Sequence, residues 1–237
     1  MLLKVIGMML LAGFILHQGS SEAFGQKRDV YQQNNALVTR QIKSAVLEGE
    51  ITELLSELAF KYDIPIGLEL DTQNPDVTDY RLEVTDGTLP ELLDQFVKQT
   101  GRYEWFIEKG VVNIYPREQH RDAFLAQILS VRVKSFDVKK GTSCWDLQKL
   151  LFETPEIKSV MDLEGIEPAG TNFSGFYIPQ LGRDFSIHVS NRKVKEILNQ
   201  IIKESPVALI WIVSRDKPAN TLRLTVNSRH EDLAKEP

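Results

Sequence analysis

The chain has 237 residues, of which 42% are hydrophobic and 26% charged, with a formal net charge of −5 and a pI near 5.5. This composition supplies ample apolar side chains for a core and excludes a disordered chain. The negative net charge excludes non-specific electrostatic binding to nucleic acid. A single cysteine, Cys144, excludes an internal disulfide.

The N-terminal residues 1–25 have the layout of a secretory signal peptide. One early cation, Lys4, precedes an apolar run at 5–16, and small and polar residues follow it. That run is shorter than the about 20 residues that span a bilayer comfortably. We therefore expect export and no integral membrane segment after cleavage; an uncleaved anchor is the alternative. Export without disulfides favours the bacterial periplasm, or secretion. A flexible lead-in is expected at 26–45.

A first unit is predicted at residues 46–116. Leucine and isoleucine recur at helical spacing over 51–58, and 46–47 is a possible opening strand. Alternating apolar residues predict strands at 66–70 and 80–84.

A second helix of this unit follows a capping box. The Thr88 hydroxyl can accept the amide of Glu91, whose carboxylate can reach back to the amide of Thr88. Gly101 is placed to end the helix in a left-handed conformation. A hairpin is predicted at 103–114, and a charged joint at 117–128.

A second unit is predicted at residues 129–228, and it repeats the first around an insertion at 154–184. LEVTDGTLPELL, which starts at Leu82, matches IHVSNRKVKEIL, which starts 105 residues later at Ile187. The expected elements are a strand at 131–138, a helix at 145–152, a strand at 185–189, a helix at 194–202, a hairpin at 209–226 and a charged tail at 229–237. The predicted fold class is α+β: two tandem small α/β units, each with two helices packed on one face of a small mixed sheet.

These stretches resemble the short N-terminal domain of bacterial secretins and TonB-dependent transducers (the STN domain). The resemblance rests on residues 51–58, 64–70 and 82–97, where a leucine-striped helix, an extended segment and a strand precede a capped helix with Glu91 and its following leucines. The second unit matches more loosely. The resemblance implies a periplasmic interaction module. This chain departs from both families in carrying neither a β-barrel nor a secretin pore segment after the units.

Catalytic and metal-binding chemistry has little support in the sequence. His120, His188 and His230 have no cysteine or carboxylate at ligand spacing, so we expect no metal site, and we expect no cofactor. Cys144, with His188 as its base, could be the nucleophile of a small hydrolase or transferase. Because Cys144 lies on the apolar stripe of its helix, a buried structural cysteine is the preferred interpretation.

Protein binding is the better-supported expectation, because small open sheets leave edge strands that can pair with a partner's strand. Three places are proposed: the strand edges at 80–84 and 111–115, the apolar-rich loop at 172–185, and the basic turn that begins the last helix. The predicted partner-binding residues are Tyr80, Leu82, Val111, Asn113, Tyr115, Phe173, Phe176, Tyr177, Arg192 and Lys193.

The expected function is therefore that of an exported, non-enzymatic protein–protein interaction module of a bacterial envelope system. Its partner would be another envelope protein or a second copy of the chain, and not a nucleic acid. Two alternatives stay open: a self-assembling ring or scaffold subunit of a secretin-like complex, and the small enzyme that uses Cys144.

Overall fold

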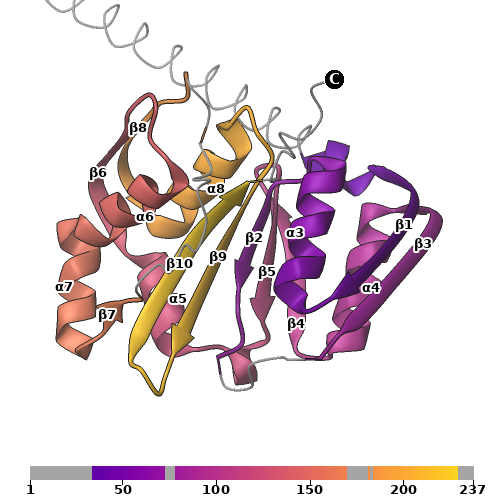
Figure 1. The fold of residues 1–237 in the computed structure, drawn as a ribbon, viewed down its shortest axis with the longest axis horizontal. Coiled ribbons are helices and arrows are strands. Elements are labelled where there is room, and N and C mark those ends of the chain that lie inside the picture. Colours follow the sequence, from indigo (N-terminus) through magenta and orange to yellow (C-terminus); the bar gives the residue numbers. More distant parts are fainter. Residues whose placement is uncertain (1–33, 73–77, 170–180, 182–183, 229–237) are drawn as a thin grey trace, which may run out of the picture.

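Two helix-and-strand units follow each other along the chain in a computed structural model, which describes residues 34–72, 78–169, 181 and 184–228 (Figure 1). The α+β class predicted from the sequence is confirmed, because helices pack against several sheets of mixed strand direction. The elements of the first unit are β1 (Gln41–Gly49), α3 (Ile51–Tyr62), β2 (Ile66–Glu69), β3 (Tyr80–Thr88), α4 (Leu89–Thr100), β4 (Tyr103–Glu108) and β5 (Val111–Pro116).

The second unit follows a short connection and keeps the same order, with one additional helix. The connection holds η1 (Glu118–His120) and α5 (Ala123–Ser130), and the unit consists of β6 (Arg132–Val138), α6 (Cys144–Glu153), α7 (Pro155–Glu164), β7 (Glu167–Pro168), β8 (Ile187–Lys193), α8 (Val194–Glu204), β9 (Leu209–Asp216) and β10 (Thr221–Ser228).

The duplication is visible in how the strands pair. In the first unit, β1 pairs antiparallel with β3, the hairpin β4–β5 is antiparallel, and β2 lies parallel to β5. In the second unit, β6 pairs antiparallel with β8, the hairpin β9–β10 is antiparallel, and β7 lies parallel to β10. The two units therefore share one topology.

The two units are joined through a single central sheet, which the sequence did not predict. Its strand order is β4-β5-β2-β9-β10-β7, so three strands of each unit meet where β2 lies parallel to β9. Figure 1 shows this sheet in the middle of the molecule, with the helices and two-stranded sheet of one unit on either side. The expectation that the helices of each unit cover one face of a separate sheet is thus incomplete: α3 and α4 lie between the β1–β3 pair and the central sheet.

Apolar residues on opposite faces of the central sheet form two cores. Ile210 and Ile212 of β9 face the first core with α3, whereas Leu209, Trp211 and Val213 face the second core with α8. Since β-strand side chains alternate between faces, one strand can contribute to both cores. β9 is therefore a buried structural element of both units.

The predicted capping box is present at the start of α4. The Glu91 amide donates to the Thr88 hydroxyl over 3.4 Å, and the Thr88 amide donates to the Glu91 carboxylate over 2.6 Å. Gly101 ends the helix at φ 69°, in the left-handed conformation expected for it.

Three segments differ from their predictions. β1 begins at Gln41 with Ile42 fully buried, so the expected flexible lead-in up to residue 45 is wrong over its last residues. The joint at 117–128 contains α5, which buries an apolar face against α8. The insertion at 154–184 begins with α7, whose first residue, Pro155, and left-handed Gly165 are ordinary helix boundaries.

Candidate functional site

A buried charged network lies beside the junction of the units, at and just beyond the carboxyl ends of β2 and β5. Glu69 has no exposed side-chain surface and accepts hydrogen bonds from Nε and Nη2 of Arg121, the shortest 2.8 Å long. Burial raises the pKa of Glu69 above its ordinary value, and the hydrogen bonds from Arg121 oppose that rise. Asp71 is equally buried and pairs with Arg102 over 3.1 Å.

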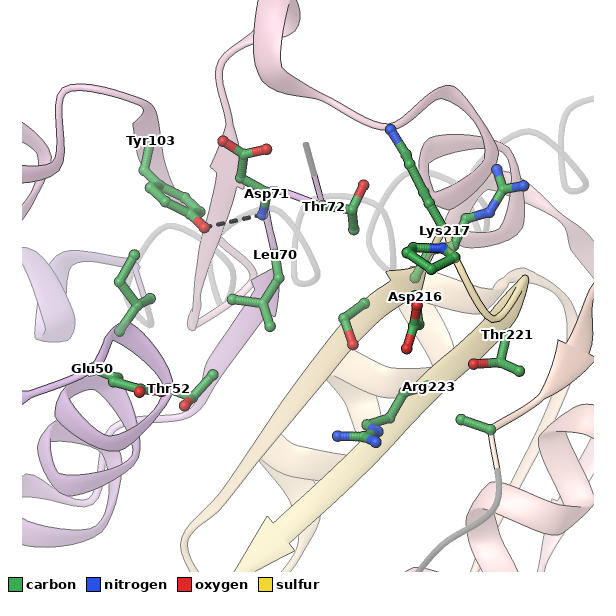
Figure 2. Close-up of a pocket in the computed structure, with 15 residues that line it drawn as sticks. Glu50, Thr52, Leu70, Asp71, Thr72, Tyr103, Asp216, Lys217, Thr221 and Arg223 are labelled. Atoms are coloured by element: carbon green, nitrogen blue, oxygen red, sulfur yellow. Dashed lines mark hydrogen bonds between the residues drawn. The ribbon is translucent and has the colours of Figure 1, made fainter. Parts of the chain in front are cut away.

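A cavity of about 880 Å³ opens beyond the same strand ends (Figure 2). Its walls come from the N-terminus of α3, the residues after β2 and the β9–β10 hairpin. Figure 2 shows Tyr103 and Asp71 on one side, where the Asp71 amide donates to the Tyr103 hydroxyl over 3.0 Å, and Lys217 on the other.

The charges around this cavity balance each other. The ionisable side chains of its lining, apart from the Tyr103 phenol, are those of Glu50, Asp71, Asp216, Arg215, Lys217 and Arg223. Three carboxylates facing three cations give no electrostatic preference for an anion or a cation. The cavity is a consequence of how the units join, and its chemistry does not define a ligand.

At one end of the central sheet, opposite the two-residue strand β7, lies strand β4. It pairs with β5 on one side, and no strand of the described chain pairs with its other side. The two-residue turn Lys109–Gly110 has φ values of 53° and 82°, which is typical of a tight hairpin turn closed by a hydrogen-bonded pair, Glu108 with Val111.

The pairing pattern that starts at this turn determines which main-chain groups of β4 point away from β5. Hydrogen-bonded and non-hydrogen-bonded pairs alternate in an antiparallel ladder, so Trp105 and Ile107 direct their amides and carbonyls away from β5. The bond from the Arg117 amide to the Arg102 carbonyl, 2.7 Å long, has the register that this assignment requires. β4 therefore offers a row of donors and acceptors to a further strand.

Exposed aromatic surface lies beside this edge. Phe106 is 40% exposed and stacks on Tyr115 of β5 with ring centroids 5.4 Å apart. The ammonium of Lys195 lies 5.2 Å from the centre of the Phe106 ring and pairs with Glu108 over 2.6 Å. An apolar ring with an adjacent cation–carboxylate pair is a surface that a protein segment can cover.

The predicted edge at 111–115 is wrong. β5 pairs with β4 on one side and with β2 on the other, so its main-chain groups are used within the sheet. Val111, Asn113 and Tyr115 are buried, with 0%, 0% and 3% exposure. Their positions help to join the units: Asn199 of α8 donates to the Asn113 amide oxygen over 2.9 Å.

The predicted edge at 80–84 is an edge in the described chain, because β3 pairs only with β1. Leu82 is fully buried and Tyr80 is half-buried. Two side chains of α4 occupy this edge: Gln95 accepts from the Glu83 amide, and Gln99 donates to the Arg81 carbonyl. Because the Glu83 amide and the Arg81 carbonyl already have partners, β3 has fewer main-chain groups than β4 that could bind a further strand.

The remaining predicted residues belong to the second half of the chain. Arg192 and Lys193 are exposed at the end of β8, where the Lys193 amide donates to Glu196 at the start of α8. Phe173, Phe176 and Tyr177 lie outside the described residues, as does the predicted signal peptide. Among the predicted residues that the structure describes, Val111 and Arg192 line one small pocket, whereas Tyr80 and Leu82 belong to β3.

The predicted nucleophile, Cys144, is 5% exposed in the second core. Burial raises the pKa of its thiol to about 12, so the thiol is protonated at neutral pH and is a poor nucleophile. His188 is exposed and pairs with Asp137 of the neighbouring strand, as expected for an outward-facing strand position. These placements give the enzyme hypothesis no support.

In the part of the chain that the structure describes, no group of three or more histidine, cysteine, aspartate or glutamate residues could hold a metal ion. None of the helices in that part of the chain is both long and apolar enough to cross a membrane.

Sequence reasoning missed β4 as a site, although a signal was present. Trp105-Phe-Ile107 and Trp211-Ile-Val213 are related stretches at equivalent places of the two units.

Comparison with protein-family models, curated proteins and solved structures found no match to the chain.

Proposed function

We propose that this chain is an exported, non-enzymatic protein–protein interaction module of a bacterial envelope, and that its partner adds a strand to β4. The observation that carries the proposal is the outer edge of β4, with its outward amides and carbonyls at Trp105 and Ile107. Main-chain hydrogen bonds to such an edge supply affinity, and side-chain pockets supply specificity. The exposed ring of Phe106 adds apolar area beside the edge.

The envelope location in this proposal rests on the predicted signal peptide and on the resemblance to STN domains. Both favour a periplasmic binding role. A protein partner, rather than a small molecule, is supported by the balanced charges of the cavity and by the open strand at the end of the sheet.

The test places a photo-crosslinking amino acid at Glu104, an exposed residue of β4, in cells that express the full chain. We expect one specific envelope protein to be captured there and not from Lys149, an exposed residue of α6. Ile107→Pro removes one outward amide without removing a β4–β5 hydrogen bond and should abolish the capture. Ile107→Val keeps the amide and should preserve it, with the circular dichroism of both variants unchanged.

Two results would overturn the proposal. Capture that persists in a folded Ile107→Pro protein would show that the strand edge is not used. Capture of only a second copy of the chain would replace the adaptor with the self-assembling subunit.

A further inference from the structure

The edge of β4 has an internal counterpart that is already occupied. The counterpart is β9, the strand that follows α8 as β4 follows α4. The indole Nε1 of Trp105 donates to Asp94 of α4 over 2.9 Å, and the indole Nε1 of Trp211 donates to Asn199 of α8 over 2.8 Å. Both the tryptophan and its acceptor are thus repeated, and the two rings are anchored to their helices in the same way.

The strand that occupies the β9 edge is β2, and it runs parallel to β9. Gly67 lies directly opposite Trp211, and the Leu70 amide donates to the Val213 carbonyl over 2.9 Å. A Cβ atom at Gly67 would lie 2.3 Å from two carbons of the buried indole. That separation is far below van der Waals contact, so the anchored ring admits only glycine at the opposite position.

Because Trp105 is anchored in the same way as Trp211, we expect a strand beside β4 to need a glycine opposite Trp105. Trp105 and Ile107 are the counterparts of Trp211 and Val213, and they have the same outward main-chain groups. Trp105 is half-buried, whereas Trp211, which β2 flanks, is fully buried. A strand beside β4 would therefore complete the burial of Trp105 as β2 does for Trp211.

We propose that the strand accepted by β4 runs parallel to it and places a glycine opposite Trp105, with an apolar residue on each side of that glycine. This inference rests on the proposed function and specifies its partner as an extended protein segment of the type seen in β2, where Ile66 and Leu68 flank Gly67. A second copy cannot supply its own β2, because that strand pairs with β5 and β9 on its two sides.

A synthetic peptide with the sequence of residues 64–71, IPIGLELD, is the direct probe. We expect saturable binding of the fluorescently labelled peptide to the full chain, measured by polarisation. Valine in place of the peptide's glycine should weaken binding at least 10-fold. In a Trp105→Ala protein, the glycine and valine peptides should bind equally, because the ring that excludes a side chain is gone. The Ile107→Pro protein should bind neither.

Orientation is tested with a benzophenone at the peptide's N-terminus. A parallel strand places this group near Arg102 and Tyr103, and an antiparallel strand places it near Glu108. Crosslinks near Glu108, or equal binding of both peptides to the unmodified chain, would overturn the inference. If either of these results is found but Glu104 still captures a specific protein in cells, the strand-edge function stands and only the requirement for a parallel strand with glycine opposite Trp105 fails. If the capture at Glu104 also fails, both proposals fail.

Discussion

At the scale of single residues, Gly67 makes the junction of the units possible. Trp211 has no exposed surface, and its indole is held by Asn199, which in turn donates to Asn113 of β5. These bonds satisfy the polar groups of a buried cluster that spans both units. The ring consequently cannot move aside, and the backbone of β2 approaches it only because residue 67 has no Cβ.

Gly67→Ala should therefore lower the free energy of unfolding by about 2–3 kcal/mol, the upper part of the usual cost of overpacking a core. Urea denaturation followed by circular dichroism measures this cost. In a Trp211→Leu background, which removes the ring, the same alanine should cost less than about 1 kcal/mol. An equal cost in both backgrounds would show that strain elsewhere in β2, and not the indole, requires glycine.

At the scale of elements, α5 depends on the carboxylate that begins it. Asp122 is 5% exposed and accepts hydrogen bonds from the amides of Phe124 and Leu125, 2.9 and 3.3 Å long. It also accepts from the Thr72 hydroxyl over 3.0 Å and lies 3.5 Å from the Lys217 ammonium. Burial acts to raise the pKa of Asp122, but the hydrogen bonds and Lys217 together hold it below the ordinary value of 3.8.

A carboxylate with a lowered pKa stabilises the folded state above its ordinary pKa, and this contribution is lost as the pH falls through the lowered value. Asp122→Asn should therefore lower the free energy of unfolding by about 1 kcal/mol at pH 7, with a difference from the unmodified chain that shrinks below about pH 4. Denaturant titrations between pH 7 and pH 2 measure that difference. Glu118→Gln, at an exposed carboxylate of η1, is the matched control. A difference that stays constant with pH contradicts the role of the charge.

At the scale of the whole molecule, the shared sheet makes the two units one structure. β9 contributes side chains to both cores, and ion pairs such as Lys195 with Glu108 cross from one unit to the other. Separating the units would expose Ile210 and Ile212, the β9 side chains that face the first core, and would leave one edge of β2 and one edge of β9 without hydrogen bonds. The junction is therefore part of the cooperative core.

Thermal unfolding should accordingly proceed in a single transition with equal calorimetric and van't Hoff enthalpies. Gly67→Val, which places a larger side chain against Trp211, should separate the transition into two by weakening the contact of β2 with β9. Differential scanning calorimetry checks both expectations. Two resolved transitions in the unmodified chain would contradict the cooperative junction.

Local structure was largely predictable because short-range patterns specify it. The spacing of leucines predicted α3, and Thr88 with Glu91 predicted the start of α4. α5 and α7 were missed although Asp122, Pro155 and Gly165 mark their boundaries, because α5 has only eight residues and α7 has only two buried apolar positions among its charged residues. Of the two predicted edges, β3 is an edge in the described chain and β5 is not. The edge of β4 was not predicted, since which strand of a hairpin faces outward is decided by what lies beside it.

The sequence by itself determined the α+β class, the duplication and the order of elements within the first unit, since each depends on periodicity and capping within a few residues. Only the tertiary structure decided that the units share one sheet, that β5 is buried and that β4 is open. Those properties depend on the pairing of β2 with β9, whose paired residues are 144 positions apart, as for Ile66 and Ile210. The local sequence feature that goes with this pairing is Gly67, which lets Trp211 lie against β2.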